Sequence, residues 1–484
     1  MEQSVSSSTA KTTPKFGGAE NEKILNKSSI VEPKPALSLI DAVALIVGIV
    51  VGAGIFRVPS LVASNAGSET AFLAAWVLGG LISLVGALCY AELASTFPNA
   101  GGDYHFLTRA YGKNLSFLFA WARMSVIQTG SVALLAFIFG DFASQLFSFG
   151  EFSAAIYAAI IIVALTAINI AGIGFGTGTQ KILTALEVLG VAAIIAAGIA
   201  AAPNASETRE LTAASTQSAS FGLTMVFVLL TYGGWNEAAY LSAELRGNRR
   251  RIAYALIVGI LIITTLYLLV NLAYLSALGL QGLAQSDAPA SDAMRGAFGN
   301  FGAQFIGLLV AISTLTSANA TIFTGARTNY AVGRDFPVLS SLGKWNERTG
   351  APVNAFLAQG AVALLLIGLG VLTRKGFETI VEYTAPVFWT FFLLTGISLF
   401  VLRRKEPNVE RPFRVPLYPL TPLIFCLTSL YLLYSSVAYT GAGALVGVVV
   451  LAIGGGLLAV LSRRNAFLNA NQMRGGKNDA NNDN

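Results

Sequence analysis

The sequence predicts an all-α membrane protein of about twelve transmembrane helices, from its composition and from the length of its apolar runs. Of the 484 residues, 54% are hydrophobic and 12% are charged, whereas soluble domains carry roughly 25% charged residues. A soluble fold of this length could not bury so much apolar surface in one or two cores. Lipid accepts apolar side chains on every side of a helix, so a membrane bundle is the fold class that fits.

Apolar runs long enough to cross a bilayer recur along the whole chain, since a spanning helix needs about 20 residues. We expect spans at 38–62, 70–95, 115–147, 154–172, 178–201, 220–243, 252–278, 299–327, 353–373, 378–402, 415–437 and 440–462. The third and eighth runs exceed one bilayer thickness, which predicts strong tilt or protrusion. Residues 1–36 and 464–484 are polar and are expected to form disordered cytoplasmic tails.

The basic residues indicate how the spans are oriented. Lys and Arg concentrate in both tails and in alternate loops, including the cluster 246–251 and the stretch 403–414. Because cytoplasmic loops carry the excess of Lys and Arg, both termini are predicted to be cytoplasmic. A multi-pass plasma-membrane protein follows, with a bacterial inner membrane favoured. The net charge of +6 is thereby explained by topology, and no nucleic-acid partner is expected.

Several classes of active site are excluded by the scarcity of the residues they need. Cys89 and Cys426 both lie in apolar runs, and His105 is the only histidine. This composition argues against a disulfide framework, a metal site, a cofactor or a catalytic triad. We therefore expect a protein that is not an enzyme.

Two spans carry closely spaced glycines near their centres. The first contains Gly52-Ala53-Gly54 and the sixth contains Gly233-Gly234. Glycine costs about 1 kcal/mol relative to alanine inside a helix, so such pairs favour opening of the helix. For either span alone, close helix packing through small residues is an equally good explanation. Interruptions at corresponding positions of two halves, however, indicate a transporter built on inverted repeats.

The inverted-repeat hypothesis divides the chain into segments. Residues 37–202 would form the first five-helix repeat and residues 219–403 the second, with opposite topology because five is odd. Residues 414–463 would then supply helices 11 and 12.

The two interruptions predict a receptor for a zwitterion. The first N–H groups of a half-helix after Gly54 would bind a carboxylate. Carbonyls near Ile49 and Val50 would accept hydrogen bonds from an ammonium group, and carbonyls at Tyr232 and Gly233 would form a second set. Both ends of an α-amino acid would thus be bound without a charged side chain.

Three stretches then resemble a known family. They are GAGIFRVPSLVASNAG (52–67), YAELASTFPNAGGDYHFLTRAYG (90–112) and TYGGWNEAAYLSAEL (231–245). Their order is similar to that of the amino acid–polyamine–organocation superfamily, and especially to the L-type amino acid transporter branch with its bacterial relatives. The motifs cover the first half of the chain, and the number of spans extends the resemblance to the rest.

The resemblance implies a five-plus-five core and a set of site residues. The substrate carboxylate would bind at Gly52, Ala53 and Gly54. The carbonyls facing its amino group would be those near Ile49, Val50, Leu230, Tyr232 and Gly233. Trp235 matches an aromatic gate over the substrate, and Asn236 matches a polar residue just after the second break.

The fifth span departs from the family at one position. Aligning TQKILTALEVLG (179–190) puts Glu187 where many relatives carry a lysine that is thought to replace a sodium ion between spans one, five and eight. An ionisable residue inside a span is a functional candidate. Ion coupling, recognition of a cationic substrate and a structural partnership all stay open, with a proton as the expected coupling ion. Lys181, six residues earlier, is expected to mark the cytoplasmic end.

Hydroxyls on the eighth span are further candidates for ion coupling. The run ISTLTSANATIF (312–323) offers Ser313, Thr316 and Ser317 toward span one. Packing by small residues is the alternative for each of them.

Charged residues near the ends of spans are expected to be structural. Glu237 or Glu244 is predicted to pair with Arg246 or Arg249, which follow in the sequence. For Arg123 and Glu92, ion pairing and simple snorkelling to the interface are both open. Asp141 has no assigned role.

These observations predict a secondary active transporter that moves a small amino acid by alternating access, with proton-coupled uptake preferred. The alternatives are a transporter of cationic amino acids or polyamines and an amino acid exchanger. Its partners would be the substrate, a proton and the lipid bilayer. The identity of the amino acid, sodium as the coupling ion and the oligomeric state stay open.

Overall fold

The computed structural model describes residues 35–52, 54–201, 221–286, 288–373, 376–440, 445 and 447–460. All of them belong to the compact unit Pro33–Asn484. Ala53, residues 1–34 of the predicted N-terminal tail and the predicted C-terminal tail lie outside the described residues. The elements of the described part are helical, apart from two isolated β-bridges, so the all-α fold class is confirmed.

Every predicted span has a helical counterpart. In chain order these are α2 (Leu39–Val50) with α3 (Gly54–Ala66), α4 (Glu69–Thr96), α6 (Lys113–Ala122) with a π-helical turn (Arg123–Ile127) and α7 (Gln128–Leu146), α8 (Ser153–Ala171), α9 (Ile173–Ala201), α10 (Phe221–Thr231) with a 3₁₀-helix η3 (Trp235–Leu241), α11 (Arg250–Gln285), α12 (Pro289–Asp335), α13 (Val353–Thr373), α14 (Gly376–Lys405), α15 (Leu420–Thr440) and a final helix Gly447–Val460. Helix α5 (Asp103–Tyr111) lies in the loop after the second span.

Length and composition support spanning for most of these helices. Within the described ranges, eight helices are long and apolar enough to cross a membrane, and the bent pair α2–α3 adds a ninth. Val353–Gly368 and Gly447–Val460 are shorter apolar helices. The chain is therefore a multi-pass membrane protein, while its division into two five-helix repeats stays a prediction.

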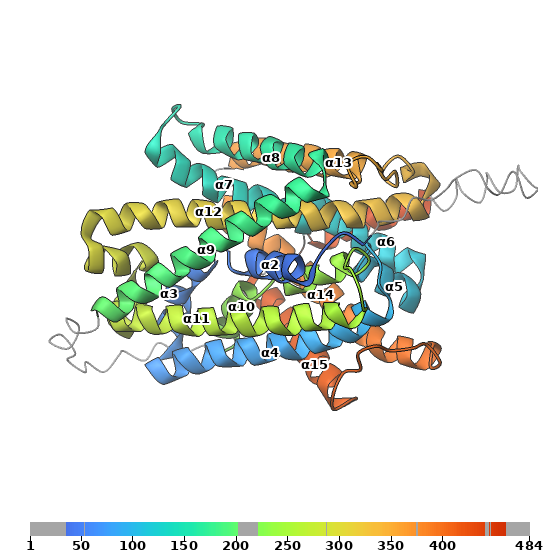
Figure 1. The fold of residues 1–484 in the computed structure, drawn as a ribbon, viewed down its shortest axis with the longest axis horizontal. Helices are drawn as coiled ribbons and strands as arrows, with labels where there is room; N and C mark the ends of the chain where they lie inside the picture. The colour runs from blue at the N-terminus through green and yellow to red at the C-terminus, as the bar shows by residue number, and fades with distance from the viewer. Residues whose placement is uncertain are drawn as a thin grey trace, which may run out of the picture. The chain divides into compact units, whose positions relative to one another are not determined.

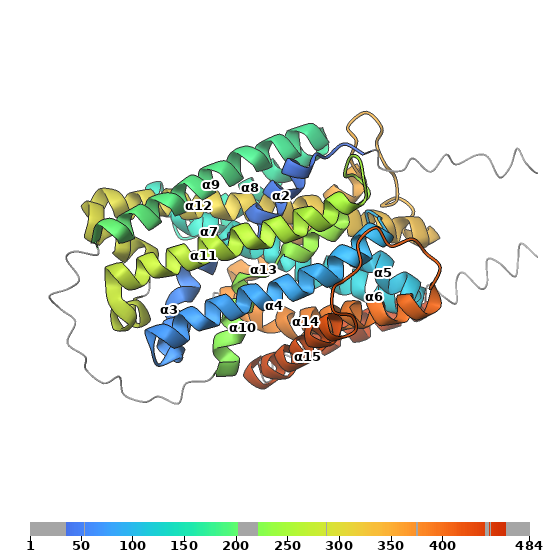
Figure 2. The same cartoon turned by 60° about the horizontal axis from the view of Figure 1, so that its bottom comes forward.

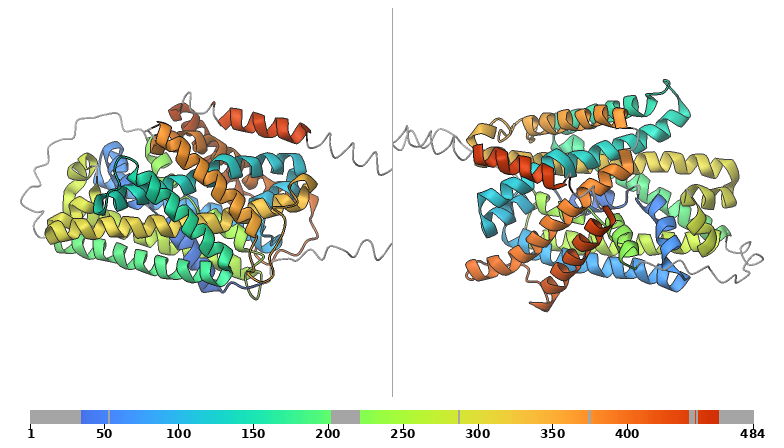
Figure 3. Two further views of the ribbon diagram at one scale, coloured as in Figure 1. Left: turned by 90° about the horizontal axis from the view of Figure 1, so that it is seen from above. Right: turned by 180° about the vertical axis from the view of Figure 1, so that it is seen from behind.

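The interrupted first span lies inside the bundle. Helix α2 contacts α9, α11 and α12, and α3 contacts α10 and α11. Helix α10 also packs against α4 and α15. In Figure 1 the short helices α2, α3 and α10 lie between the long helices α11 and α12, and Figure 3 shows the same bundle from above and from behind. Both interrupted spans are thus held by several neighbours.

The long seventh and eighth spans bend at glycines. Gly279 in α11 has a φ of 65°, and Gly299 in α12 has a φ of 62°. A positive φ is a conformation that glycine adopts at little cost. The segment that Figure 2 shows folded back at one end of α12 lies before Gly299. It therefore precedes the predicted eighth run of 299–327, which continues within α12 to Asp335.

The basic loops meet at one end of the bundle. Three contacts join the loops that follow spans two, six, eight and ten: Arg109 with Glu406, Lys113 with Asp335 at 3.8 Å, and Arg250 Nε with the Pro412 carbonyl at 2.6 Å. This grouping agrees with the predicted topology. We call it the basic end; its assignment to the cytoplasm stays a prediction.

Candidate functional site at the two helix breaks

The first span is discontinuous. The last α-helical bond of α2 runs from Val51 N–H to the Val47 carbonyl at 2.8 Å. Val51 has φ −74° and ψ 72°, and Gly52 N–H turns back to the Val50 carbonyl at 2.8 Å. This is the geometry of an inverse γ-turn. Helix α3 restarts at Gly54 at an angle of 47° to α2, so the predicted break is confirmed.

The sixth span is also discontinuous. Helix α10 ends at Thr231, and Gly233 N–H bonds the Leu230 carbonyl at 3.1 Å in a tighter turn. Gly234 then has a φ of +111°, a left-handed conformation that side chains disfavour. The chain continues from Trp235 as a 3₁₀-helix. The predicted break is confirmed, and the 3₁₀ form of the following segment is a feature that the sequence did not indicate.

The two breaks lie against each other. A Cβ atom added at Gly234 would be 2.5 Å from Ile49 Cγ2, and one added at Gly54 would be 3.2 Å from Thr231 Cγ2. The glycines therefore serve two purposes, since they permit the turns and let the main chains approach closely.

Tyr267 of α11 joins the two breaks through one hydroxyl. Its Oη lies 2.6 Å from the Val50 carbonyl and 3.0 Å from the Thr231 carbonyl. Both carbonyls belong to the last turns before the breaks and lack their usual helical donors. Sequence reasoning missed this residue because several tyrosines occur in apolar spans, and only the fold shows which one reaches the breaks.

Hydroxyls of α12 bind further carbonyls of the first break. Ser317 Oγ donates to the Gly48 carbonyl at 3.1 Å, and Ser313 Oγ lies 3.1 Å from the Val51 carbonyl. In a continuous helix the Gly48 carbonyl would accept from Gly52 N–H, which instead turns back. Buried carbonyls need donors, and in lipid these must come from the protein.

Thr316 and Gly48 lie where α2, α9 and α12 are in close contact. Thr316 Oγ1 donates to the Ile312 carbonyl of its own helix at 2.8 Å. A Cβ atom at Gly48 would be 2.6 Å from the Thr316 methyl and 2.3 Å from Thr184 Oγ1. These contacts show that α2 approaches α9 and α12 closely at Gly48. A part for Thr316 in ion coupling stays a prediction.

Glu187 of α9 lies beside the first break. Its side chain is fully buried, and its Oε1 is hydrogen-bonded to Ser313 Oγ. Its Oε2 has no hydrogen-bond partner among the described residues. Glu187, Ser313 and Ser317, three predicted ion-coupling residues, are therefore grouped around the same turn. Lys181 pairs instead with Asp41 at 3.0 Å near the start of α2.

The carbonyls predicted to face a substrate ammonium already accept hydrogen bonds. Ser317 Oγ lies 3.4 Å from the Ile49 carbonyl, while Val50 accepts from Tyr267 and Leu230 from Gly233 N–H. A carbonyl oxygen has two lone pairs, so a second donor still has a place at Ile49 and Leu230. Val50 already accepts from both Tyr267 Oη and Gly52 N–H.

Trp235 lies in an aromatic cluster at the second break. Its ring centroid is 5.2 Å from Tyr90, 5.4 Å from Phe392 and 6.5 Å from Phe425. A cavity of about 20 Å³ is lined by Trp235 and Asn236 among others. That volume holds about one water molecule. A molecule larger than water would fit here only after the aromatic rings move.

Beyond the second break, two buried ion pairs hold the sixth span. Arg123 of the third span pairs with Glu237 at 2.5 Å, and its guanidinium lies 4.2 Å from the Tyr240 ring centroid. Arg327 of the eighth span binds both carboxylate oxygens of Glu244, at 2.5 and 2.7 Å. All four charged side chains are buried.

The predicted pairing of Glu237 or Glu244 with Arg246 or Arg249 is wrong. These two arginines are exposed, whereas the actual partners come from helices distant in sequence and lie in the interior. For Glu92, ion pairing is the alternative that holds, since it binds Arg403 at 2.5 Å.

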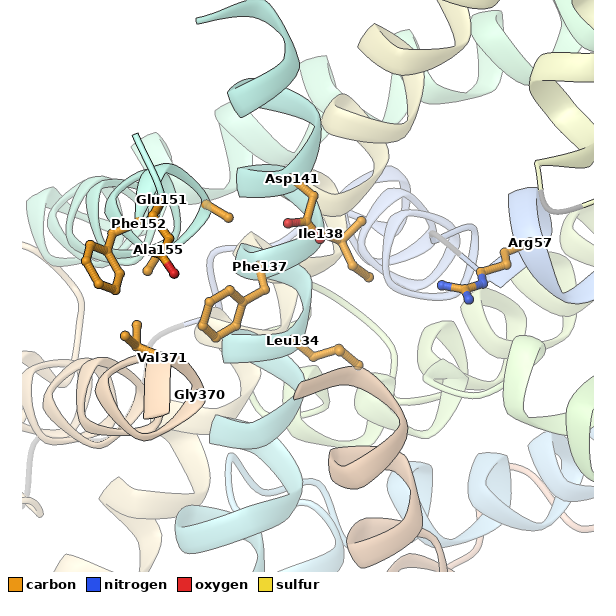
Figure 4. Close-up of a pocket in the computed structure, with 11 residues that line it drawn as sticks. Arg57, Leu134, Phe137, Ile138, Asp141, Glu151, Phe152, Ala155, Gly370 and Val371 are labelled. Carbon is orange, nitrogen blue, oxygen red and sulfur yellow. The ribbon is translucent and has the colours of Figure 1, made fainter. Parts of the chain in front are cut away.

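A larger cavity lies at the end remote from the basic loops. It has a volume of about 500 Å³ and is lined by residues of α3, α7, α8, α13 and the loop before α8, including Arg57, Asp141, Glu151, Phe137 and Phe152. Figure 4 shows Arg57 and Asp141 on different walls of this cavity. Asp141, which had no assigned role, thus lies in the wall of this cavity. The predicted substrate-binding residues that the structure describes do not line it.

Known proteins resemble this chain over most of its length. The family described as amino acid permease matches residues 37–458. The chain is 31% identical over 434 residues to the human b(0,+)-type amino acid transporter 1, which covers 86% of both chains. It is also 31% identical over 452 residues to the mouse large neutral amino acids transporter small subunit 2, which covers 88% of this chain and 81% of the relative. The resemblance to the L-type branch is confirmed, and the chain belongs to the amino acid permease family, whose members are transporters and not enzymes.

Proposed function

We propose that this protein is a secondary transporter that moves α-amino acids by alternating access, with both termini in the cytoplasm. The observation that carries the proposal is the pair of main-chain breaks that lie against each other in the first and sixth spans. Such interruptions place hydrogen-bonding main chain within the membrane, where it binds small polar substrates.

The substrate's carboxylate is assigned to the start of α3 and its ammonium to the carbonyls before the breaks. The first N–H groups of a helix lack intrahelical partners, which suits the start of α3 at Gly54 to an anion. Gly52 and Ala53 directly precede it, and Gly52 N–H would leave the Val50 carbonyl to join them. The ammonium would take the remaining lone pairs at Ile49, Leu230, Tyr232 and Gly233. At Val50 it would replace Tyr267 Oη or Gly52 N–H, which both already bond that carbonyl. Trp235 would move as the substrate enters, with Asn236 beside it.

Exchange of amino acids is favoured over proton-coupled uptake of a small one. The chain is similar to a transporter named for large neutral amino acids. This similarity supports substrates whose side chains are larger than those of small amino acids. Reorientation of the sixth span would separate its pairs with Arg123 and Arg327. Because breaking buried pairs is costly, the carrier would change conformation when bound substrate offsets that cost. This behaviour is that of an exchanger.

Proton-coupled uptake is the second candidate function. It is supported by Glu187, a carboxyl group fully buried beside the first break. Ionisable side chains within spans commonly bind the coupling ion.

Flux measurements in proteoliposomes test both candidates. Purified protein is reconstituted with or without internal leucine, and uptake of labelled alanine, leucine, arginine and putrescine is followed. We expect uptake of leucine that requires an internal amino acid. Concentrative uptake into empty vesicles under an inward proton gradient would instead support the second candidate. Absence of flux for every amino acid, with internal amino acid present, would contradict the proposed function.

A further inference from the structure

The hydroxyl of Ser313 lies between two oxygen atoms that need a hydrogen. Its Oγ is 3.1 Å from the Val51 carbonyl and is also hydrogen-bonded to Glu187 Oε1. A serine hydroxyl has one hydrogen, and both a carbonyl and a carboxylate only accept. With Glu187 ionised, one of the two contacts would have no hydrogen. Both contacts are hydrogen bonds if Glu187 carries the second hydrogen itself.

The Val51 carbonyl receives no other hydrogen bond from the described residues. In a continuous helix it would accept from Ile55 N–H, but that group bonds the Gly52 carbonyl at 3.3 Å. A buried carbonyl left without a donor is destabilising. Ser313 is therefore required at Val51 as the replacement for the missing helical hydrogen bond.

The described surroundings of Glu187 supply no positive charge. From α11 the nearby titratable group is Tyr267, from α12 the partner is the neutral Ser313, and α2 presents main chain at Val51. The closest basic residue along α9, Lys181, is about 9 Å away along the helix axis and pairs with Asp41. A buried carboxylate without a cation is strongly unfavourable in this setting.

We propose that Glu187 is held as the neutral acid in this conformation, with its O–H donating to Ser313 Oγ and the Ser313 hydrogen donating to the Val51 carbonyl. The inference rests on the proposed function and extends it, because it makes a bound proton part of the first break. Release of that proton would turn the Ser313 hydrogen toward Glu187 and leave Val51 without a donor. Glu187 is then a proton-binding residue that positions the break, and it is not a counter-charge for a cationic substrate.

Infrared difference spectroscopy tests the protonation of Glu187 independently of transport. Spectra of the full-length protein in lipid are recorded for wild type and Glu187→Gln near neutral pH. We expect wild type to show a carboxylic acid band that the variant lacks. A missing carboxylate band in the variant, with no change in the carboxylic acid region, would overturn the proposal.

Transport by two variants with substitutions at Glu187 tests the hydrogen-bond chain from Glu187 through Ser313 to the Val51 carbonyl. The amide of Glu187→Gln donates to Ser313, whereas the side chain of Glu187→Leu has a similar size and no donor. We expect Glu187→Leu to exchange leucine at least about tenfold more slowly than Glu187→Gln, because it leaves a hydrogen bond unmade. Equal rates for both variants, or faster exchange by Glu187→Leu, would contradict the chain.

Ser313→Ala has a matched control on another span. Ser398 is equally buried, and its hydroxyl donates to the Thr395 carbonyl of its own helix at 2.6 Å. We expect Ser313→Ala to slow exchange about as much as Glu187→Leu, while Ser398→Ala exchanges at the wild-type rate. An unaffected Ser313→Ala would overturn the proposal. Failure of wild type to transport any amino acid would contradict the proposed function and leave the infrared result as the test of Glu187.

Discussion

The break in the first span and the segment after the break in the sixth span are stabilised by different chemistry. Around the first break, neutral hydroxyls of Tyr267, Ser313 and Ser317 bind the freed carbonyls. After the second break, buried arginines bind Glu237 and Glu244. Both segments lie within helices that would otherwise be continuous, yet one is held by single hydrogen bonds and the other by ion pairs.

The difference has a physical reason. Hydrogen bonds between neutral groups contribute about 1 kcal/mol each and are exchanged at low cost when a substrate supplies its own donors. Separating a buried ion pair leaves two charges without partners and costs several kcal/mol. The first break is therefore suited to binding, and the segment after the second break is suited to holding one conformation until substrate is bound.

The largest effect is expected from breaking one ion pair of the sixth span. Arg327→Ala leaves the Glu244 carboxylate buried without a cation, which should lower the free energy of unfolding by about 3–5 kcal/mol. Thermal unfolding in detergent, followed by intrinsic fluorescence, measures this loss. Arg295→Ala is the control because its pair with Asp292 is exposed, and such pairs contribute little. Equal destabilisation by both variants would show that burial does not distinguish the pairs.

Gly234→Ala should be the next most damaging change. Its φ of +111° strains any side chain, at a cost of about 1–3 kcal/mol, and the new Cβ would be 2.5 Å from Ile49 Cγ2. We expect the two breaks to separate and leucine exchange in proteoliposomes to be lost.

Gly178→Ala is the matched control for Gly234→Ala. Gly178 lies within α9, and a Cβ atom added there would meet no neighbouring element within 4 Å. Alanine there should leave exchange unchanged and stabilise the helix by up to about 1 kcal/mol. Retained exchange by Gly234→Ala would contradict the contact between the breaks.

Tyr267→Phe tests the first break, which neutral hydroxyls stabilise. It removes the hydroxyl near the Val50 and Thr231 carbonyls. Val50 keeps its Gly52 N–H donor, but Thr231 loses its contact, and an unpaired buried carbonyl costs about 1–3 kcal/mol. We expect a higher KM for leucine and a lower unfolding temperature. Tyr274→Phe on the same helix should have the smaller effect, since its contact with the Ile55 carbonyl is 3.4 Å long. A larger effect of Tyr274→Phe than of Tyr267→Phe would contradict the role of Tyr267 at the breaks.

The smallest expected effect is a pH dependence of the free energy of unfolding, caused by a carboxyl group at the basic end. Burial raises the pKa of the Asp103 carboxyl in α5 from 3.8 to about 6, although Tyr90, Arg123 and Tyr240 oppose the shift. The folded protein then binds the proton more tightly than the unfolded chain. This contribution lowers stability as pH rises from about 4 to about 6. Asp103→Asn should remove it.

His105 has the opposite contribution in the same pH range. Burial and the neighbouring Arg109 lower the pKa of His105 from 6.5 to about 4, so this group lowers stability as pH falls. The measurement is therefore the difference in unfolding temperature between wild type and Asp103→Asn across pH 4 to 6. A difference that does not change with pH would show that Asp103 ionises normally.

Local sequence features predicted the two breaks correctly, but they did not predict what surrounds the breaks. Gly52 and Gly233–Gly234 were recognisable because glycine disfavours a helix wherever it occurs. Tyr267 had no distinguishing neighbours in sequence, and the pairs of Glu237 and Glu244 join residues more than eighty positions apart. Predicting their partners from nearby arginines failed because Glu237 and Glu244 are buried, whereas Arg246 and Arg249 are exposed although they are close in sequence.

The sequence by itself determined the membrane environment, the helical fold class, the position of the breaks and the family, since each depends on composition or on short motifs. Only the tertiary structure decided that the breaks contact each other, that Ser313 links Glu187 to Val51, and that Trp235 lies in an aromatic cluster. Hydrogen bonds and ion pairs act over a few ångströms, so they depend on how the helices are rotated and packed. In lipid, the apolar pattern of a helix does not specify its rotation or its neighbours.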